Sequence, residues 1–123
     1  MYREVFIRDM SQLGIRVSNE LKNSPVLSSL NSVIESAYRD NPYFTPEMQR
    51  FALNSISNKM LQERLLRGWL QKYDHQKSEK DLLAGIIMAG NIPAVGFHDL
   101  VAGLAAGLKC DVKLSKKDKY IIP

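Results

Sequence analysis

The residues whose types and spacing could do chemistry lie between Gly85 and Asp118, and the first of them is Asn91. It stands in the turn Gly90-Asn91-Ile92-Pro93, which separates a short apolar run from an apolar helical segment. A neutral amide held at the end of a strand can donate a hydrogen bond to an oxygen that gains negative charge during a reaction. Asparagines are also common in turns and at helix caps, so spacing alone leaves a purely structural role open.

A second candidate site is the lysine-rich stretch that follows. Within residues 109–119, five lysines stand beside only two aspartates, whereas the rest of the chain is nearly balanced and the net charge is +4. These lysines are Lys109, Lys113, Lys116, Lys117 and Lys119. A cluster confined to one segment predicts a local anion site, because a nucleic-acid-binding protein would need a basic face across the molecule. A solvated run of charge is the simpler alternative.

The other reactive residue types do not form a site in the sequence. Cys110 is the only cysteine and is distant in the sequence from both histidines, His75 and His98, so neither a disulfide nor a metal site is expected. Its place within a predicted strand favours a buried thiol over a nucleophile. His98 and Asp99 are adjacent on a predicted helix, where neighbouring side chains diverge, so they cannot orient one another as a catalytic pair.

Length and composition describe an ordinary globular domain. The chain has 123 residues, of which 45% are hydrophobic and 24% charged, which suits one modest core. The first residues lead into a mixed amphipathic segment, and the longest apolar run is too short to cross a bilayer. We therefore expect a cytoplasmic protein with no membrane span and no nucleic-acid partner.

Residues 1–73 read as helices that pack together. Apolar residues recur every three or four positions from Tyr2 to Leu21, which predicts a first amphipathic helix. Ser24-Pro25 is a typical start for a second helix that ends before Asn41. Thr45-Pro46 repeats the start signal for a third helix, which continues with a possible break into the following residues.

After a polar linker at residues 74–81, the pattern changes over residues 82–123. The apolar run Leu82 to Met88 predicts a buried parallel strand, and Ala94 to Ala106 predicts a helix with Gly107 as its C-terminal cap. Lys109 to Leu114 predicts a second strand. Together they form one βαβ unit.

Two parallel strands are too few for a stable sheet, because parallel sheets bury both faces and contain several strands. Either partner chains complete the sheet, in a homo-oligomer, or a C-terminal domain beyond Pro123 does so.

The segment GIIMAGNIPAVGFHDLVAGLAAGLKCDVKLSKKD resembles the acyl-CoA reductase family of the aldehyde dehydrogenase superfamily, which includes the fatty-acyl reductase component of bacterial bioluminescence systems. The upstream NPYFTPEMQRFALNSI is similar to the helical N-terminal region of that family. The superfamily usually has Pro-Trp-Asn after its first strand, where the asparagine amide donates to the thioester oxygen. Ala89-Gly90-Asn91 stands in that place, so the resemblance assigns Asn91 the oxyanion role and places Met88, Ala89 and Gly90 beside the cofactor.

The superfamily also carries Lys-Pro-Ser-Glu after its second strand, where lysine and glutamate contact the adenosine ribose of the dinucleotide. This chain has Lys113-Leu114-Ser115-Lys116 instead. The resemblance assigns Lys113 and Ser115 to the ribose. Lys116 replaces a carboxylate that would repel a 2′-phosphate with a cation that could pair with it, which predicts NADP(H) in preference to NAD(H).

The resemblance therefore implies an α/β fold: an N-terminal helical region followed by the first βαβ unit of an aldehyde-dehydrogenase-like dinucleotide-binding domain, incomplete and mostly α. The implied function is that of the N-terminal portion of an acyl-CoA reductase, which reduces a fatty acyl-CoA to an aldehyde with NADPH through a cysteine thioester. The family's cysteine lies beyond these residues, so the chain alone should be inactive. The alternative is a small α-rich assembly module that completes its sheet by oligomerisation.

Overall fold

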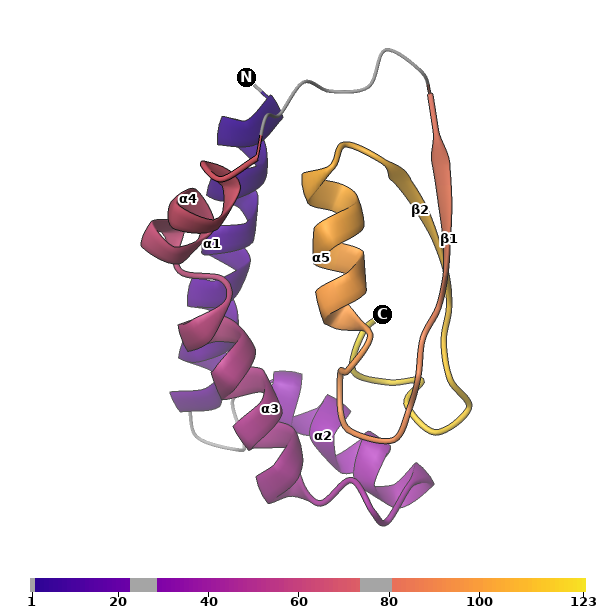
Figure 1. Ribbon diagram of the computed structural model, residues 1–123. Coiled ribbons are helices and arrows are strands. Elements are labelled where there is room, and N and C mark those ends of the chain that lie inside the picture. Colours follow the sequence, from indigo (N-terminus) through magenta and orange to yellow (C-terminus); the bar gives the residue numbers. More distant parts are fainter. Residues whose placement is uncertain (1, 23–28, 74–80) are drawn as a thin grey trace.

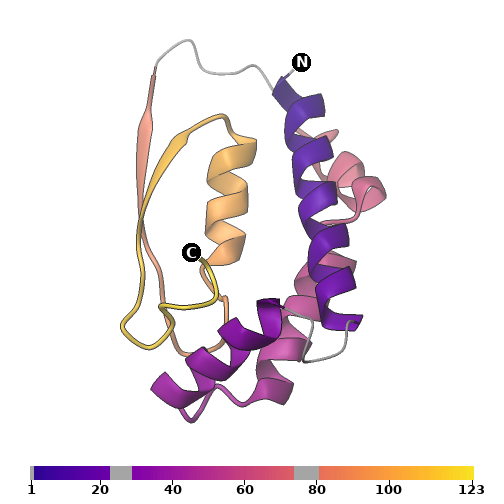
Figure 2. The same cartoon turned by 180° about the vertical axis from the view of Figure 1, so that it is seen from behind.

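The computed structural model describes residues 2–22, 29–73 and 81–123 and arranges them in layers (Figure 1). One layer consists of α1, α3 and α4, the next is the single helix α5, and the last is a two-stranded sheet (Figures 1 and 2). The elements are α1 (Tyr2–Lys22), α2 (Ser29–Asp40), α3 (Pro46–Lys59), α4 (Glu63–Leu70), β1 (Leu83–Ile87), α5 (Phe97–Ala105) and β2 (Lys109–Lys113). The fold is thus mostly helical with a small parallel sheet.

The helical part follows the start and stop signals of the sequence. Thr45 caps α3 by accepting a hydrogen bond from the Met48 backbone N–H at 3.2 Å, and Pro46 occupies the first turn, as predicted. The expected break in the third helix occurs after Lys59, since α4 begins only at Glu63. The predicted Ser24-Pro25 start of the second helix lies outside the described residues, and so does most of the 74–81 linker.

The buried face of α3 includes a polar residue, Gln49. Gln49 is fully buried, and its side-chain amide donates to the carbonyl oxygens of Ile34 at 3.0 Å and Phe44 at 2.7 Å. Leu53 and Ser57 continue this buried row one turn at a time. The apolar residues of α3 that are most evident in the sequence therefore lie on a neighbouring face, which is only partly covered.

The βαβ unit has the predicted topology. β1 and β2 are parallel, in a register that pairs Leu83 with Lys109 and Ile87 with Lys113. Gly107 follows α5 with a φ of 78°, and the N–H groups of Gly107 and Leu108 donate to the carbonyl oxygens of the last helical turns at 3.0 and 3.1 Å. This is a Schellman cap, so the assignment of Gly107 as the C-terminal cap is confirmed.

The expectation of a fully buried strand from Leu82 to Met88 is wrong. The side chains of β1 alternate, and its outward residues are exposed: Leu83 by 64% and Ile87 by 84%. The inward residues of both strands face α5, but among the described residues no element covers the opposite face. A parallel sheet normally has helices on both faces, so this sheet is covered on one side only.

A single core joins the helical part to the βαβ unit. Its buried members come from α1, the α3–α4 junction, α4 and α5: Phe6, Ile7, Leu61, Leu66, Leu70, Val101 and Ala105. The hydroxyl of Tyr2 at the start of α1 also donates to the Leu104 carbonyl oxygen of α5. Within the described ranges, no helix has both the length and the apolarity needed to cross a membrane.

Candidate functional site

The two segments singled out by the sequence meet at the carboxyl end of the sheet. The backbone N–H of Met88 donates to the Lys113 carbonyl oxygen at 3.0 Å, which holds the ends of β1 and β2 together. Just beyond, Gly90 is buried so closely against Ser115 that a Cβ there would lie 2.2 Å from the Ser115 Oγ. Only a glycine permits this approach. The turn that carries Asn91 and the turn after β2 therefore form one surface.

Asn91 is exposed at this end of the sheet and does not cap the following helix. α5 begins at Phe97, three residues later than predicted, and its N-cap position is Gly96. The intervening residues make a turn in which Ala94 has a φ of 57°, a left-handed conformation that is costly for alanine. The alternative that Asn91 caps the following helix is therefore wrong. Its exposed position before this turn is compatible both with a purely structural turn residue and with a residue that contacts a ligand.

A buried carboxylate secures that turn. Asp118 is only 5% exposed, and its Oδ2 accepts a hydrogen bond from the Ala94 backbone N–H at 2.7 Å. Burial raises the pKa of Asp118, and hydrogen bonds from the backbone N–H groups of Ala94 and Ile121 oppose this rise. The sequence interpretation counted Asp118 as one charge in a lysine-rich run. The only sequence feature that could have indicated its contact with the Ala94 turn is that Asp118 is an acidic residue between two lysines.

The five lysines have different environments. Lys109 pairs with Asp81 at 2.7 Å and Lys119 pairs with Asp40 at 3.2 Å, so these two lysines already have carboxylate partners within the chain. Lys113, Lys116 and Lys117 are exposed, and no ion pair to them occurs in the described part of the chain. The cations left for an anion are thus at the end of β2 and in the turn beside Gly90.

The remaining predicted site residues divide into buried and accessible ones. Met88 is buried, and its side chain packs on Gly96 so tightly that a Cβ at Gly96 would lie 2.3 Å from the Met88 Cγ. The Met88 side chain therefore packs under the turn that ends at Gly96 and does not reach the surface. Ala89 is exposed and Ser115 is half-buried, with its Oγ accepting from the Lys117 N–H at 3.2 Å.

Hydroxyl and cationic groups lie close together beside this turn. Ser115 offers a hydroxyl oxygen, and Lys113 and Lys116 offer exposed cations on the same edge of the sheet. Gly90 itself is covered by Ser115 and Lys117, so the groups that a ligand could reach here are the exposed side chains of Lys113 and Lys116. A ribose with a nearby phosphate could be held by these groups.

Cys110 is half-buried on the face of β2 that looks toward α5. A Cβ at Gly103 of α5 would lie 2.8 Å from the Cys110 Sγ, so the thiol fills space between helix and sheet. This position suits packing between α5 and the sheet. The search of the described residues also finds no group of three or more His, Cys, Asp or Glu side chains placed to hold a metal ion.

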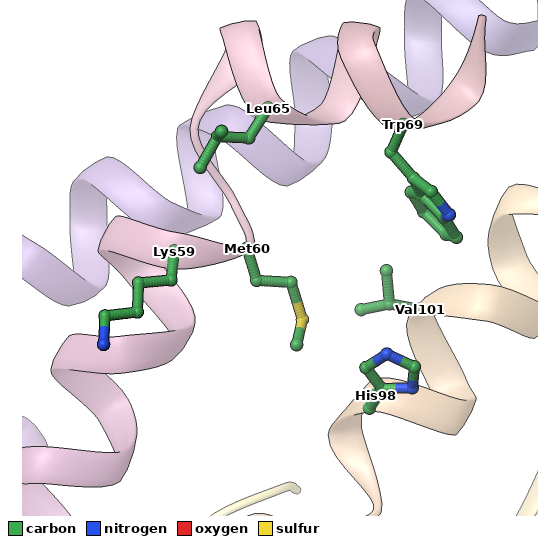
Figure 3. A pocket seen from close by; sticks show the side chains of 6 residues that line it. All are labelled: Lys59, Met60, Leu65, Trp69, His98 and Val101. Carbon is green, nitrogen blue, oxygen red and sulfur yellow. The ribbon is translucent and has the colours of Figure 1, made fainter. Parts of the chain in front are cut away.

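Two adjoining hollows lie beside the core, between residues of α3, α4 and α5, and the sequence interpretation missed both. The smaller has a volume of about 220 Å³; Figure 3 shows Met60, Trp69, His98 and Val101 pointing toward one another across it. The larger is a groove of about 720 Å³ between α3 and the turn after Asn91. Met60 and His98 line both, so the two hollows are neighbours. We call the larger one the α3 groove.

No family model, curated protein or solved structure matches this chain.

Proposed function

We propose that the chain contributes the first part of the dinucleotide-binding site and the oxyanion donor of an NADP(H)-dependent acyl-CoA reductase. The observation that supports this most is the contact of Gly90 with Ser115, which joins the Asn91 turn and the lysine-bearing turn at the carboxyl end of parallel strands. Ligands of open α/β sheets bind outside the carboxyl ends of the strands.

Each residue has a defined task in this proposal. The Asn91 side-chain amide donates to the carbonyl oxygen of the acyl thioester as negative charge develops there. Ser115 and Lys113 bind the adenosine ribose, and Lys116 binds its 2′-phosphate. NADPH supplies the hydride when it is bound. The thiol that receives the acyl group must come from outside these residues, because the only cysteine, Cys110, faces α5.

The proposal is tested by measuring how NADPH and NADH bind to the chain and to Lys116→Glu. The substitution places a carboxylate where the 2′-phosphate should lie, so we expect NADPH affinity to fall at least tenfold while NADH affinity changes little. Exposed charges a few ångströms apart interact by about 1 kcal/mol in water and more near a protein surface. Lys72→Glu is the matched control, because Lys72 is an exposed lysine beyond α4 and away from the sheet.

Equal loss of NADPH affinity in both variants would show that only net charge matters. Failure of NADPH to bind the unmodified chain at millimolar concentration would contradict the proposed site. Asn91→Ala should leave NADPH affinity unchanged, since Asn91 acts on the acyl group, and should lower the rate of a complete reductase on the order of 10²–10³-fold.

A second candidate function, that of an assembly module, is favoured by the uncovered face of the sheet. Leu83 and Ile87 expose two large apolar side chains on one strand, and neither edge of the sheet has a partner strand among the described residues. Exposed strand edges pair readily with other chains. If the sheet is completed by a second copy, sedimentation should show a dimer that Ile87→Lys dissociates. The matched control Ile15→Lys changes an exposed residue of α1.

A further inference from the structure

The outer edge of β1 presents backbone groups that have no strand to pair with. The Met88 N–H donates to the Lys113 carbonyl oxygen at 3.0 Å, so Met88 and every second residue before it turn their backbone groups toward β2. The N–H and carbonyl groups of Leu83, Gly85 and Ile87 therefore point to the opposite edge. Among the described residues, no strand lies along that edge.

The two edges of the sheet differ in charge. On the uncovered face, β2 carries Lys109, Asp111 and Lys113, all of them exposed. On the same face, β1 carries the exposed apolar side chains of Leu83 and Ile87, and the strand contains no charged residue and no proline. Charged side chains, lysine above all, keep an edge strand from pairing. The edge that invites another strand is therefore that of β1.

Gly85, in the middle of β1, is a glycine that the described chain does not require. Of the described glycines only Gly107 has a positive φ, so the Gly85 backbone suits any residue. A Cβ at Gly85 would meet no atom within 4 Å. Glycine weakens the interior of a strand and often marks a place where another backbone approaches closely. Because the described residues supply no such neighbour, the close approach comes from a strand outside them.

The sequence of β1 is complementary to itself in the antiparallel direction. A two-fold axis through Gly85 places Leu83 of one copy opposite Ile87 of the other, and Ala84 opposite Ile86. Residues 83, 85 and 87 then exchange about six backbone hydrogen bonds. On the uncovered face, large apolar pairs flank the two glycines on both sides. On the α5 side, each small alanine opposes a large isoleucine.

Such pairing also removes the weakness of a two-stranded parallel sheet. Two copies combine their strands in the order β2-β1-β1-β2, which exceeds the minimum of about three strands for independent stability. The central pair is antiparallel, an arrangement that tolerates one solvated face, while α5 of each copy covers the other face. The charged β2 strands become the two outer edges, where charge prevents further growth.

We propose that β1 pairs with β1 of a second copy of the chain, in the antiparallel direction and with Gly85 on the two-fold axis. The inference deepens the assembly role proposed above and rests on it, and it is independent of the dinucleotide site. The dimer should be weak, because a single pair of strands buries less than the roughly 1,200 Å² of a standard interface.

Disulfide cross-linking at Gly85 tests the position of the axis. In the proposed pair, the two Gly85 Cα atoms lie about 5.5 Å apart, within the roughly 4.4–6.8 Å that a disulfide spans. Gly85→Cys has open space for its side chain and should therefore form a covalent dimer in oxidised glutathione. The unmodified chain, in which Cys110 is half-buried, gives the background rate.

Asp111→Cys is the matched control. Asp111 is exposed on the same face and is the register partner of Gly85. In the proposed dimer, three strand spacings separate the two copies of Asp111, about 14 Å, which is too far for a disulfide. We expect Gly85→Cys to cross-link at least about tenfold faster than Asp111→Cys. Equal rates would indicate random collisions, and faster linkage of Asp111→Cys would place the interface at β2; either result overturns the proposal.

An exchange of charges tests the register. Ile87→Lys places a cation opposite Leu83 of the second copy and should weaken the dimer in sedimentation. Adding Leu83→Glu creates opposite charges at both crossings, so the double variant should dimerise severalfold more tightly than Ile87→Lys at low salt. Leu83→Lys added to Ile87→Lys should not restore the dimer. Both positions are exposed, so the variants should fold, which circular dichroism confirms. No recovery by Leu83→Glu would overturn the register.

Sedimentation of the unmodified chain separates this inference from the broader assembly role. A dimer whose Gly85→Cys variant does not cross-link would leave the assembly role standing and show that the β1 pairing is wrong. A monomer at all concentrations up to about 1 mM would contradict both, because even weak interfaces associate in that range. Neither result depends on whether NADPH binds.

Discussion

The contact between Gly90 and Ser115 leads to a prediction that can be measured as a coupling energy. In Gly90→Ala, the new Cβ would lie 2.2 Å from the Ser115 Oγ and 2.5 Å from the Ser115 Cβ. The hydroxyl can rotate away, but the Cβ is fixed to the backbone, so the two turns must separate. Ser115→Gly removes both atoms, and the next contact is the Lys117 Cβ at 3.2 Å.

The magnitude follows from the separations. Carbon atoms pack best at about 3.5–4.0 Å, so a Cβ–Cβ distance this short places Gly90→Ala at the upper end of overpacking costs, about 3 kcal/mol. Ser115→Gly alone should cost about 0.5–1 kcal/mol, through the greater freedom of glycine in the unfolded chain. In the double variant the clash is largely absent, so it should cost only about 1 kcal/mol. The coupling between the two positions is then about 2–3 kcal/mol.

Urea unfolding of the four proteins gives this coupling. The single tryptophan, Trp69, is half-buried against the core and its fluorescence should report the transition. Equal dependence of the unfolding free energy on urea in all four proteins would show that the unfolded states are comparable. Additivity of the two substitutions within about 0.5 kcal/mol would refute the reasoning, because the two turns would then not touch.

Three further predictions concern stability. Gly68→Ala adds a Cβ that meets nothing within 4 Å and should raise the free energy of unfolding by about 0.5–1 kcal/mol, whereas Gly14→Ala places its Cβ 2.7 Å from a neighbouring side chain and should lower it. Burial raises the pKa of Asp118 above its ordinary value. The protonated carboxyl group therefore contributes to the free energy of unfolding at low pH, and this contribution is lost as the pH rises through the folded-state pKa. Asp118→Asn keeps an acceptor for the Ala94 N–H, so its unfolding free energy relative to the unmodified chain should increase from pH 3 to pH 7, while Asp118→Ala should be less stable throughout. Gln49→Ala removes two buried hydrogen bonds, to the carbonyl oxygens of Ile34 and Phe44, and should lower the free energy of unfolding by about 2 kcal/mol or more, measured in thermal or urea unfolding.

The sequence was informative where local chemistry decides the structure. Thr45-Pro46 predicted the start of α3, and Gly107 predicted the end of α5, because a cap and a left-handed turn depend on a few neighbouring residues. The order strand, helix, strand was also predictable, since apolar runs of these lengths joined by a helix form a parallel pair.

It was less informative where distant segments decide the structure. The apolar character of Ile87 predicted burial, but whether a strand face is covered depends on what packs against it. Gln49 was not expected in the core, because its burial depends on two carbonyl groups: that of Ile34 in α2 and that of Phe44 just before α3. Asp118 likewise owes its role to the Ala94 turn, which lies 24 positions earlier in the sequence.

The core that α1 and α4 share with α5 couples these three helices into one cooperative unit. Phe6 and Leu70 belong to the same buried cluster as Val101, so α5 cannot leave the helical layer without exposing residues of both regions. Amides in the middle of α1 and of α5 should then exchange their hydrogens through the same global opening. A displacement of α5 that starts at the Asn91 turn would thus also disturb the start of α1, where the Tyr2 hydroxyl donates to the Leu104 carbonyl oxygen in the last turn of α5.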